Sequence, residues 1–268
     1  MPFTAAHAAA ALPFQRTRLI PSALVIGTLA PDFEYFLTFG PRSGFGHTLP
    51  GAFLLTLPLA LVVLWLFHRF VKVPFAAALP TSIRLRLIPY LEKFRFSGPS
   101  RFASIVFSIL LGIATHLVWD SFTHRGMWPY GHWSFLRGVF NVPVLGLIRT
   151  TTLLQYCSTL IGLGLLTVWL LSWYRTVPMS NRPSGLQLSA KRKIAAIVLG
   201  SGLALIAGLS RGVATAGIPN SRHSLQVFVG EAVVTMLALV WWQLVFIGLI
   251  FGKSVALLDS NSHDCPSF

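Results

Sequence analysis

The sequence predicts an all-α polytopic membrane protein, a helical bundle of five long spans preceded by a short N-terminal helical hairpin. The chain has 268 residues, of which 54% are hydrophobic and only 10% are charged, whereas a soluble domain carries about 25% charged residues. The hydrophobic residues gather in long runs, and the basic residues lie mostly in the loops between them. Both features are typical of a chain that crosses a bilayer several times.

Each long run comes near the roughly 20 residues that a helix needs to cross the hydrocarbon core. The five runs are residues 49–70, 102–119, 153–173, 194–216 and 225–251. Two shorter apolar pieces, residues 4–14 and 19–37, precede them and are expected to form a hairpin. The first piece is short for a span, so both a spanning and a re-entrant or interfacial position stay open for it.

We expect a single integral-membrane domain over residues 1–268. The half that carries the polar motifs is residues 1–140, and residues 141–258 complete the helical bundle. The polar residues 259–268 are expected to form a flexible tail, because chain ends without apolar side chains are rarely held in place.

The net charge of +14, from 21 basic and 7 acidic residues, would suggest nucleic-acid binding in a soluble protein. Here the basic residues flank apolar runs, so the expected partners are membrane lipids with anionic head groups, and no nucleic acid is expected. The loops 69–101 and 174–193 are the most basic, which predicts that they are cytoplasmic. The oligomeric state is not predicted.

The stretch "HLVWDSFTH" places His116, Asp120 and His124 four residues apart at the end of an apolar run. These positions share one helix face if the helix continues as far as His124. Imidazole and carboxylate groups together suit zinc, manganese or iron, although the carboxylate could instead orient a ligating histidine. Ionisable groups at membrane depth are costly and are commonly functional.

Three further motifs bring polar residues to the same predicted membrane face, the extracytoplasmic one. "FTAAHAAA" supplies His7, "LAPDFEYF" supplies Asp32 and Glu34, and "GFGHTLPG" supplies His47. A single histidine near a membrane interface is most often a hydrogen-bonded structural residue. The convergence of four motifs is therefore the stronger signal, and it predicts one polar site built from distant segments.

Four stretches, "MPFTAAHAAAALPF", "LVIGTLAPDFEYFL", "GHTLPGAFLLTLPLALVVLWLFH" and "LGIATHLVWDSFTHRGMW", together resemble an uncharacterised bacterial integral-membrane family, the domain-of-unknown-function family 4184. The resemblance is strongest over residues 1–140. The order of the motifs is also similar to that of bacterial inner-membrane proteins described as metal-dependent hydrolases and, more remotely, to zinc-dependent phospholipase C. The resemblance implies a multi-pass protein of the bacterial inner membrane.

The resemblance implies a set of site residues, carried over position by position. The matching positions are His7, Asp32, Glu34, His47, His116 and Asp120. Glu34 stands where the broader group has a second aspartate, and His47 lies in Gly-His-Thr where that group has Thr-His-Ser. The His-Arg-Gly that precedes this element in the broader group is missing here, and His124 is additional.

The leading hypothesis is a metal-dependent hydrolase with its site at the extracytoplasmic interface, acting on a lipid or another phosphoester. The expected cofactor is a divalent metal ion, zinc before others, and Asp32 or Glu34 is the expected general base. The expected metal ligands are His7, Asp32, His47, His116, Asp120 and His124. Two alternatives stay open, a scaffold protein whose polar cluster only holds segments together and a transporter.

Two features of the last two runs predict close contact between them. Arg211 and Glu231 lie at matching depth on sequential antiparallel spans, so they are expected to form an ion pair. Gly208 and Gly212 lie four residues apart and extend a row of small residues, which permits close approach of two helix backbones.

Overall fold

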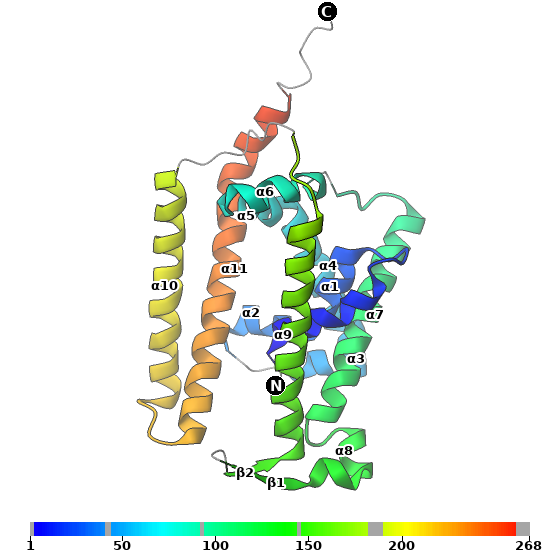
Figure 1. The fold of residues 1–268 in the computed structure, drawn as a ribbon, viewed down its shortest axis with the longest axis vertical. Helices are drawn as coiled ribbons and strands as arrows, with labels where there is room; N and C mark the ends of the chain where they lie inside the picture. Colours follow the sequence, from blue (N-terminus) through cyan, green and yellow to red (C-terminus); the bar gives the residue numbers. More distant parts are fainter. Residues whose placement is uncertain (1–2, 41–43, 92–93, 144–145, 182–189, 261–268) are drawn as a thin grey trace, which may run out of the picture. The chain divides into compact units, whose positions relative to one another are not determined.

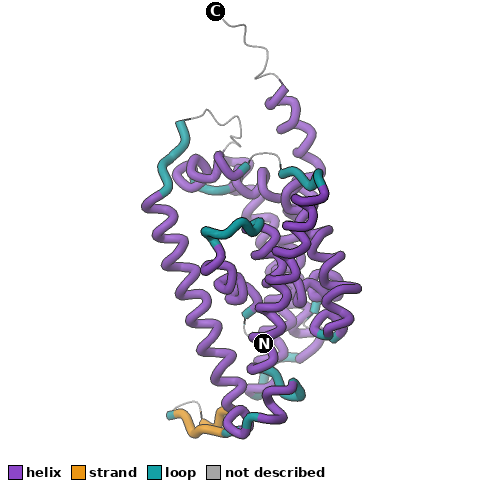
Figure 2. Tube along the Cα trace, turned by 90° about the vertical axis from the view of Figure 1, so that its right-hand side faces the viewer, coloured by secondary structure: helices purple, strands orange, loops and turns teal. Residues whose placement is uncertain are grey.

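A computed structural model describes most of the chain. The described residues are 3–40, 44–91, 94–143, 146–181 and 190–260. The predicted polar tail, residues 259–268, lies almost entirely outside them. Figure 2 shows that helices make up nearly all of what is described.

Within the described residues, five helical stretches are long and apolar enough to cross a membrane. They are Leu49–Ala78, Pro99–His132, Thr150–Thr176, Val198–Ala216 and His223–Ile250. Each overlaps one of the five predicted runs, which confirms a multi-pass, all-α membrane bundle.

The chain folds into two compact units that interleave along the sequence. One unit consists of Met1–Phe33, Ser43–Leu64 and Phe96–Arg175. The other consists of Glu34–Arg42, Trp65–Arg95 and Thr176–Phe268. We refer to them as the first and the second unit.

The first unit contains the predicted N-terminal hairpin. Its arms are η1 (Thr4–Phe14), a 3₁₀-helix, and α1 (Pro21–Leu29), which begins with proline at a position where no intrahelical N–H bond is lost. Both arms contact α7 (Pro99–Thr123), the second spanning helix (Figure 1). The second apolar piece, residues 19–37, is divided into α1, η2 (Ala30–Phe33) and α2 (Glu34–Thr38), with Pro31 in the short 3₁₀ turn between the two helices.

The span after the hairpin is one continuous helix assembled from several turns. It begins with α3 (Leu49–Gly51), and α4 (Leu57–Leu66) lies between two π-helical turns, η4 (Ala52–Thr56) and η5 (Phe67–Val71). It ends with α5 (Lys72–Ala78). The basic loop that follows holds α6 (Thr81–Leu87) and η6 (Ile88–Tyr90).

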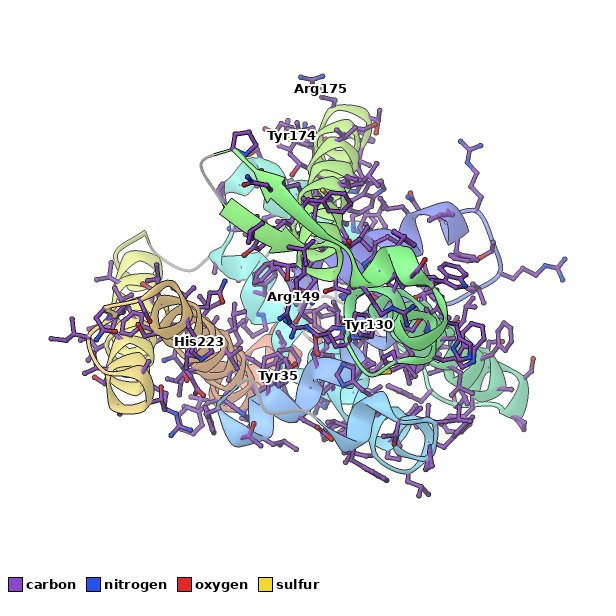
Figure 3. The ribbon with its side chains drawn as sticks, turned by 90° about the horizontal axis from the view of Figure 1, so that it is seen from below. Tyr35, Tyr130, Arg149, Tyr174, Arg175 and His223 are labelled. Atoms are coloured by element: carbon purple, nitrogen blue, oxygen red, sulfur yellow. The ribbon has the colours of Figure 1, made fainter. Side chains whose placement is uncertain are left out.

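A small β-hairpin precedes α9 (Thr150–Thr176), and the sequence reading did not anticipate it. After α8 (Trp128–His132) and η7 (Ser134–Arg137), β1 (Val139–Val142) pairs antiparallel with β2 (Gly146–Arg149), and Val139 lies opposite Arg149. These are the strands in Figure 2. Arg149 leads into α9, and Tyr174 and Arg175 lie at the other end of that helix (Figure 3). Aromatic and basic residues at helix ends suit the two membrane interfaces.

The second unit is organised around α11 (Arg222–Ser260), which packs along α10 (Ala190–Ala216). A Cβ added to Gly208 would lie 2.6 Å from the carbonyl oxygen of Ala232, and one added to Gly212 would lie 2.9 Å from the Phe228 ring. The two glycines therefore face α11, which confirms the predicted close approach of the two helices.

The same helix pair contains the predicted ion pair. Arg211 Nε lies 3.4 Å from Glu231 Oε2, and the Glu231 side chain is only 8% exposed whereas that of Arg211 is 39% exposed. Nearby, Thr235 Oγ1 donates to the Phe39 carbonyl at 2.9 Å, so α11 also satisfies a backbone group just after α2. The buried partner, Glu231, depends most on the pair, because a charge inside the span has no water to solvate it.

We expect Glu231→Gln to lower the free energy of unfolding by about 1–3 kcal/mol, because Arg211 loses its ionic partner. The double variant Arg211→Glu with Glu231→Arg should regain part of that loss. Thermal unfolding in detergent measures both, and Arg175→Gln, at an exposed helix end, is the control. A swapped protein no more stable than the worse single variant would show that the pair does not hold α10 and α11 together.

Candidate metal centre

The centre is built on one face of α7. Gly112, His116 and Asp120 follow each other at intervals of four residues, and all three face the protein interior. The exposed fraction is 0% for His116 and 1% for Asp120. The helix ends at Thr123, and His124 adopts an extended backbone, so His124 leaves the shared face that a longer helix would have given it.

Direct contact between two backbones positions this face. A Cβ added to Gly112 would lie 2.5 Å from the Leu24 carbonyl oxygen on α1, and one added to Gly27 would lie 2.3 Å from the Ile109 carbonyl oxygen. No side chain larger than hydrogen fits at either position without separating α1 from α7. The close crossing brings the last turn of α1 within hydrogen-bond distance of His116.

His116 is fixed in one tautomer by that crossing. Its Nδ1 lies 2.8 Å from the carbonyl oxygen of Thr28. A carbonyl only accepts hydrogen bonds, so Nδ1 carries a proton, and in the neutral imidazole Nε2 presents its lone pair. An imidazole that donates one ring N–H to a backbone carbonyl and turns its other nitrogen inward is the usual arrangement of a metal-ligating histidine.

Asp32 reaches the centre from the short 3₁₀ turn η2, where it is buried. Thr4 Oγ1 donates to Asp32 Oδ2 at 2.5 Å, which ties the start of η1 to this carboxylate. The other oxygen, Oδ1, lies 3.4 Å from His47 Nε2. One oxygen of Asp32 is thus held by the protein, and the other points into the cluster.

His47 is presented by a tightly fixed loop. Thr48 begins the next helix and accepts a hydrogen bond from the Gly51 N–H at 3.0 Å, while Thr56 donates to the Gly46 carbonyl at 3.2 Å. A Cβ on Gly51 would lie 1.7 Å from the Phe45 carbonyl oxygen, so only glycine fits there. The motif "GFGHTLPG" is therefore a helix start that aims one imidazole at the cluster.

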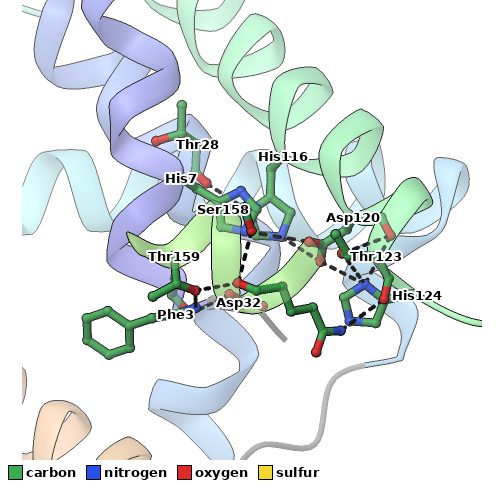
Figure 4. A network of polar contacts seen from close by, with 12 residues as sticks. Phe3, His7, Thr28, Asp32, His116, Asp120, Thr123, His124, Ser158 and Thr159 are labelled. Carbon is green, nitrogen blue, oxygen red and sulfur yellow. Dashed lines mark hydrogen bonds and ion pairs between the residues drawn. The ribbon is translucent and has the colours of Figure 1, made fainter. Parts of the chain in front are cut away.

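Three histidines, from η1, the His47 loop and α7, lie around Asp120. Figure 4 shows His7 and His116 beside it. Asp120 Oδ1 lies 3.5 Å from His7 Nε2, and Oδ2 lies 3.3 Å from His116 Nε2 and 3.6 Å from His47 Nε2. The His7 ring also stacks on the His116 ring, with centroids 4.0 Å apart. Two groups of three have ligand atoms within 4.8 Å of one another, His7 with His116 and Asp120, and Asp32 with His47 and His116.

The donor atoms in this cluster lie close enough together to hold a metal ion. Among the described residues, the buried oxygens Asp32 Oδ1, Asp120 Oδ1 and Asp120 Oδ2 have no hydrogen-bond partner. They face imidazole nitrogens at 3.3–3.6 Å, and the nearest of these, His116 Nε2, presents a lone pair when the imidazole is neutral. Ligands bound tetrahedrally at about 2.0–2.1 Å lie about 3.3–3.4 Å apart. The spacing of the donor atoms therefore fits a metal ion.

His47 supplies positive charge when it is protonated. Burial lowers its pKa, but the carboxylates of Asp120 and Asp32 outweigh burial and raise the pKa of His47 to about 9. At neutral pH an imidazolium can thus balance part of the negative charge of the two aspartates. A metal ion would take the place of that proton, since a histidine ligand must be neutral.

Two of the predicted site residues lie apart from the ligand groups. The His124 side chain is 28% exposed, and its Nδ1 lies 3.0 Å from the Asp120 carbonyl oxygen and 3.6 Å from Asp120 Oδ2. It therefore lies at the rim and belongs to neither group of three. Glu34 begins α2 and belongs to the second unit, and its role as general base stays a prediction.

The sequence reading missed the residues that hold the ligands in place. Thr4 holds Asp32, Thr28 sets the tautomer of His116, and Gly112 permits the helix contact that brings Thr28 to His116. The signal for Gly112 was present, because it precedes His116 by one helical turn in "LGIATH". Nothing in the sequence pairs Thr4 with Asp32.

Fold and cluster together define a multi-pass helical membrane protein with a buried histidine and aspartate centre at the end of a span. Over residues 1–249 the chain matches the family described as Domain of unknown function (DUF4184), and the chain belongs to that family. No curated protein and no solved structure matches the chain.

Gly112→Ala is expected to displace α1 from α7 and so to remove the Thr28 carbonyl from His116. We expect the free energy of unfolding to fall by about 1–3 kcal/mol, as is usual when a packed contact is overfilled, together with a loss of bound metal. Thermal unfolding and elemental analysis measure the two effects. The matched control is Gly164→Ala on α9, where an added Cβ meets no described atom within 4 Å. Equal behaviour of the two variants would contradict the proposed role of the glycine contact.

Proposed function

We propose that this protein is a membrane-embedded metal-dependent hydrolase acting on a phosphoester, with zinc as the first candidate for its ion. The observation that carries the proposal is the position of the buried His116 Nε2, which lies 3.3 Å from the carboxylate oxygen Asp120 Oδ2 while Nδ1 is bonded to the Thr28 carbonyl. When the imidazole is neutral, both of these atoms are electron-rich, and a cation bound between or beside them removes their repulsion.

The number of ligands supports a catalytic ion over a purely structural one. Each of the two overlapping groups supplies three ligands, and three protein ligands leave a position open for water or substrate, as in catalytic zinc sites. A divalent ion bound there makes water a better nucleophile at neutral pH and polarises a phosphoester oxygen.

The residues of the chain have separate tasks in this proposal. One of the two groups of three, His7 with His116 and Asp120 or Asp32 with His47 and His116, holds the ion. His124 lies beside them at the rim. The Thr28 carbonyl and the Thr4 hydroxyl orient His116 and Asp32. Asp32 and Glu34 are the proposed general bases.

The same contacts also favour a second candidate, a scaffold in which the cluster joins η1, η2 and the His47 loop to α7. Here the protonated His47, with its pKa raised to about 9, would take the place of the ion. The two candidates differ in whether the purified protein retains metal.

We expect about one divalent ion per chain in the purified protein and only background metal in the double variant His116→Ala with Asp120→Ala. His132→Ala is the control, since His132 is exposed and its Nδ1 is bonded to the Trp128 carbonyl. Elemental analysis beside thermal unfolding decides the question. A folded wild-type protein that holds no more metal than the double variant would support the scaffold and overturn the hydrolase.

Ion-dependent hydrolysis of a phosphoester is the functional test. Chelation or Asp32→Asn should abolish turnover together with the bound ion. Glu34→Gln should keep the ion and reduce turnover if Glu34 acts as a base. Turnover that persists after the ion is removed would contradict the proposal.

We further propose that the protein lies in the bacterial inner membrane with the centre near the extracytoplasmic face. The basic loops 69–101 and 174–193 support this orientation through the positive-inside rule. The start of α7, which follows the first basic loop, would then be cytoplasmic, and Asp120, near the end of α7, would be close to the outer surface.

Cysteine labelling at the two ends of this span tests the orientation. In a background with Cys157 and Cys265 replaced by serine, an impermeant maleimide applied to intact cells should label Ser134→Cys and leave Ser100→Cys unlabelled. Both positions are exposed. Labelling of Ser100→Cys alone would reverse the orientation.

A further inference from the structure

A cavity of about 410 Å³ lies in the first unit between α7 and α9, with η1 forming one wall. Its size falls in the range of small-molecule sites, about 300–1,000 Å³. The lining is mainly apolar and includes Ala10 from η1, Val118 and Trp119 from α7, and Ile161 and Leu165 from α9.

The hydroxyl groups in the lining are already used within the protein. Thr115 Oγ1 donates to the Gly112 carbonyl at 2.7 Å, and Ser158 Oγ donates to the Gln155 carbonyl at 3.0 Å. A polar ligand would lose its hydrogen bonds to water on entering and would regain few from this lining. The cavity therefore suits a hydrocarbon.

His7 belongs to both the cavity and the metal centre. It lines the cavity, while its Nε2 lies 3.5 Å from Asp120 Oδ1 and its ring stacks on His116. The imidazole of His7 thus separates an apolar space from a charged one. A molecule with a hydrocarbon part and a charged head group could occupy both sides of this ring.

The cavity runs along the two spans from the end that carries the metal centre. On α7 its residues 115–119 precede Asp120 and so lie further into the helix. On α9 it extends from Ser158 to Leu165, about 12 to 22 Å from the helix start at Thr150, given a rise of about 1.5 Å per residue. A chain in it would lie parallel to the lipid chains of the membrane.

The cavity is also accessible from the bilayer. Val118 is 60% exposed and Ile161 is 62% exposed, although both lie within spanning helices. Only 6% of the most apolar window of α9 is buried in the protein. Lipid surrounds such surfaces, so an acyl chain can enter from the side.

We propose that this cavity holds one hydrocarbon chain of a membrane lipid whose phosphoester head group lies at the metal centre. The substrate class is then a lipid phosphoester, because a divalent ion prefers anionic oxygen ligands and the cavity selects the chain. This assignment rests on the proposed metal-dependent hydrolase, and it adds which part of the protein recognises the substrate.

Three soluble probes separate the head group from the chain: ethyl phosphate, octanol and octyl phosphate. Ala10→Phe fills the cavity, and the matched control Leu160→Phe adds a ring at a 73% exposed position of α9 outside the lining. Binding is measured by calorimetry on the purified, metal-loaded protein in one detergent, so partitioning of each probe into micelles is the same for all variants.

We expect octyl phosphate to bind wild type at least about tenfold more tightly than ethyl phosphate does, since each buried methylene contributes about 0.8 kcal/mol. Ala10→Phe should weaken the binding of octyl phosphate and of octanol at least about tenfold. The affinity for ethyl phosphate and the metal content should not change. Leu160→Phe should change none of these values.

The outcomes separate the two proposals. If the metal content is normal and Ala10→Phe does not change the affinity for octanol or octyl phosphate, the chain site is refuted and the hydrolase proposal is unaffected. Absence of metal, with octanol still sensitive to Ala10→Phe, would overturn the hydrolase and support the cavity as a chain site. Loss of ethyl phosphate binding in Ala10→Phe would show that this variant disturbs the metal centre. The test then passes to Val118→Trp, which fills the cavity from α7. The chain site is refuted if Val118→Trp does not weaken octanol binding.

Discussion

The close crossing of α1 and α7 at Gly27 and Gly112 is the constraint on which the metal centre depends. It brings the Thr28 carbonyl to 2.8 Å from His116 Nδ1, and this contact leaves Nε2 directed at Asp120. A larger side chain at either glycine would alter the position of His116 and the space available for an ion.

The two buried aspartates of the metal centre impose an electrostatic constraint. Asp32 and Asp120 are both buried, and three of their oxygens have no hydrogen-bond partner among the described residues. Buried carboxylates are stable only when positive charge compensates them. This positive charge can come from a proton on His47 or from a metal ion, and the two compete for the same nitrogen of His47. Folding of the N-terminal segments and occupation of the centre are therefore coupled.

Much of this arrangement could be predicted from the sequence, because membrane spans and i, i+4 spacing are local signals. The five spans, the ion pair of Arg211 with Glu231 and the convergence of His7, Asp32, His47, His116 and Asp120 all followed from apolar run length, helix geometry and topology. The break of 19–37 at η2, the end of α7 before His124 and the β-hairpin before α9 did not. They depend on tertiary contacts and turn chemistry, as does the selection of Thr4 and Thr28 as partners of the ligands.

X-ray absorption spectroscopy at the zinc edge tests the central claim most directly, because it reports the atoms bound to the ion rather than its presence alone. The structure predicts nitrogen and oxygen neighbours at about 2.0–2.1 Å, with the multiple-scattering signature of imidazole, and a smaller imidazole contribution in His116→Ala. A spectrum without imidazole, or one with sulfur neighbours at about 2.3 Å, would show that an ion bound by this protein is not held by the cluster around Asp120.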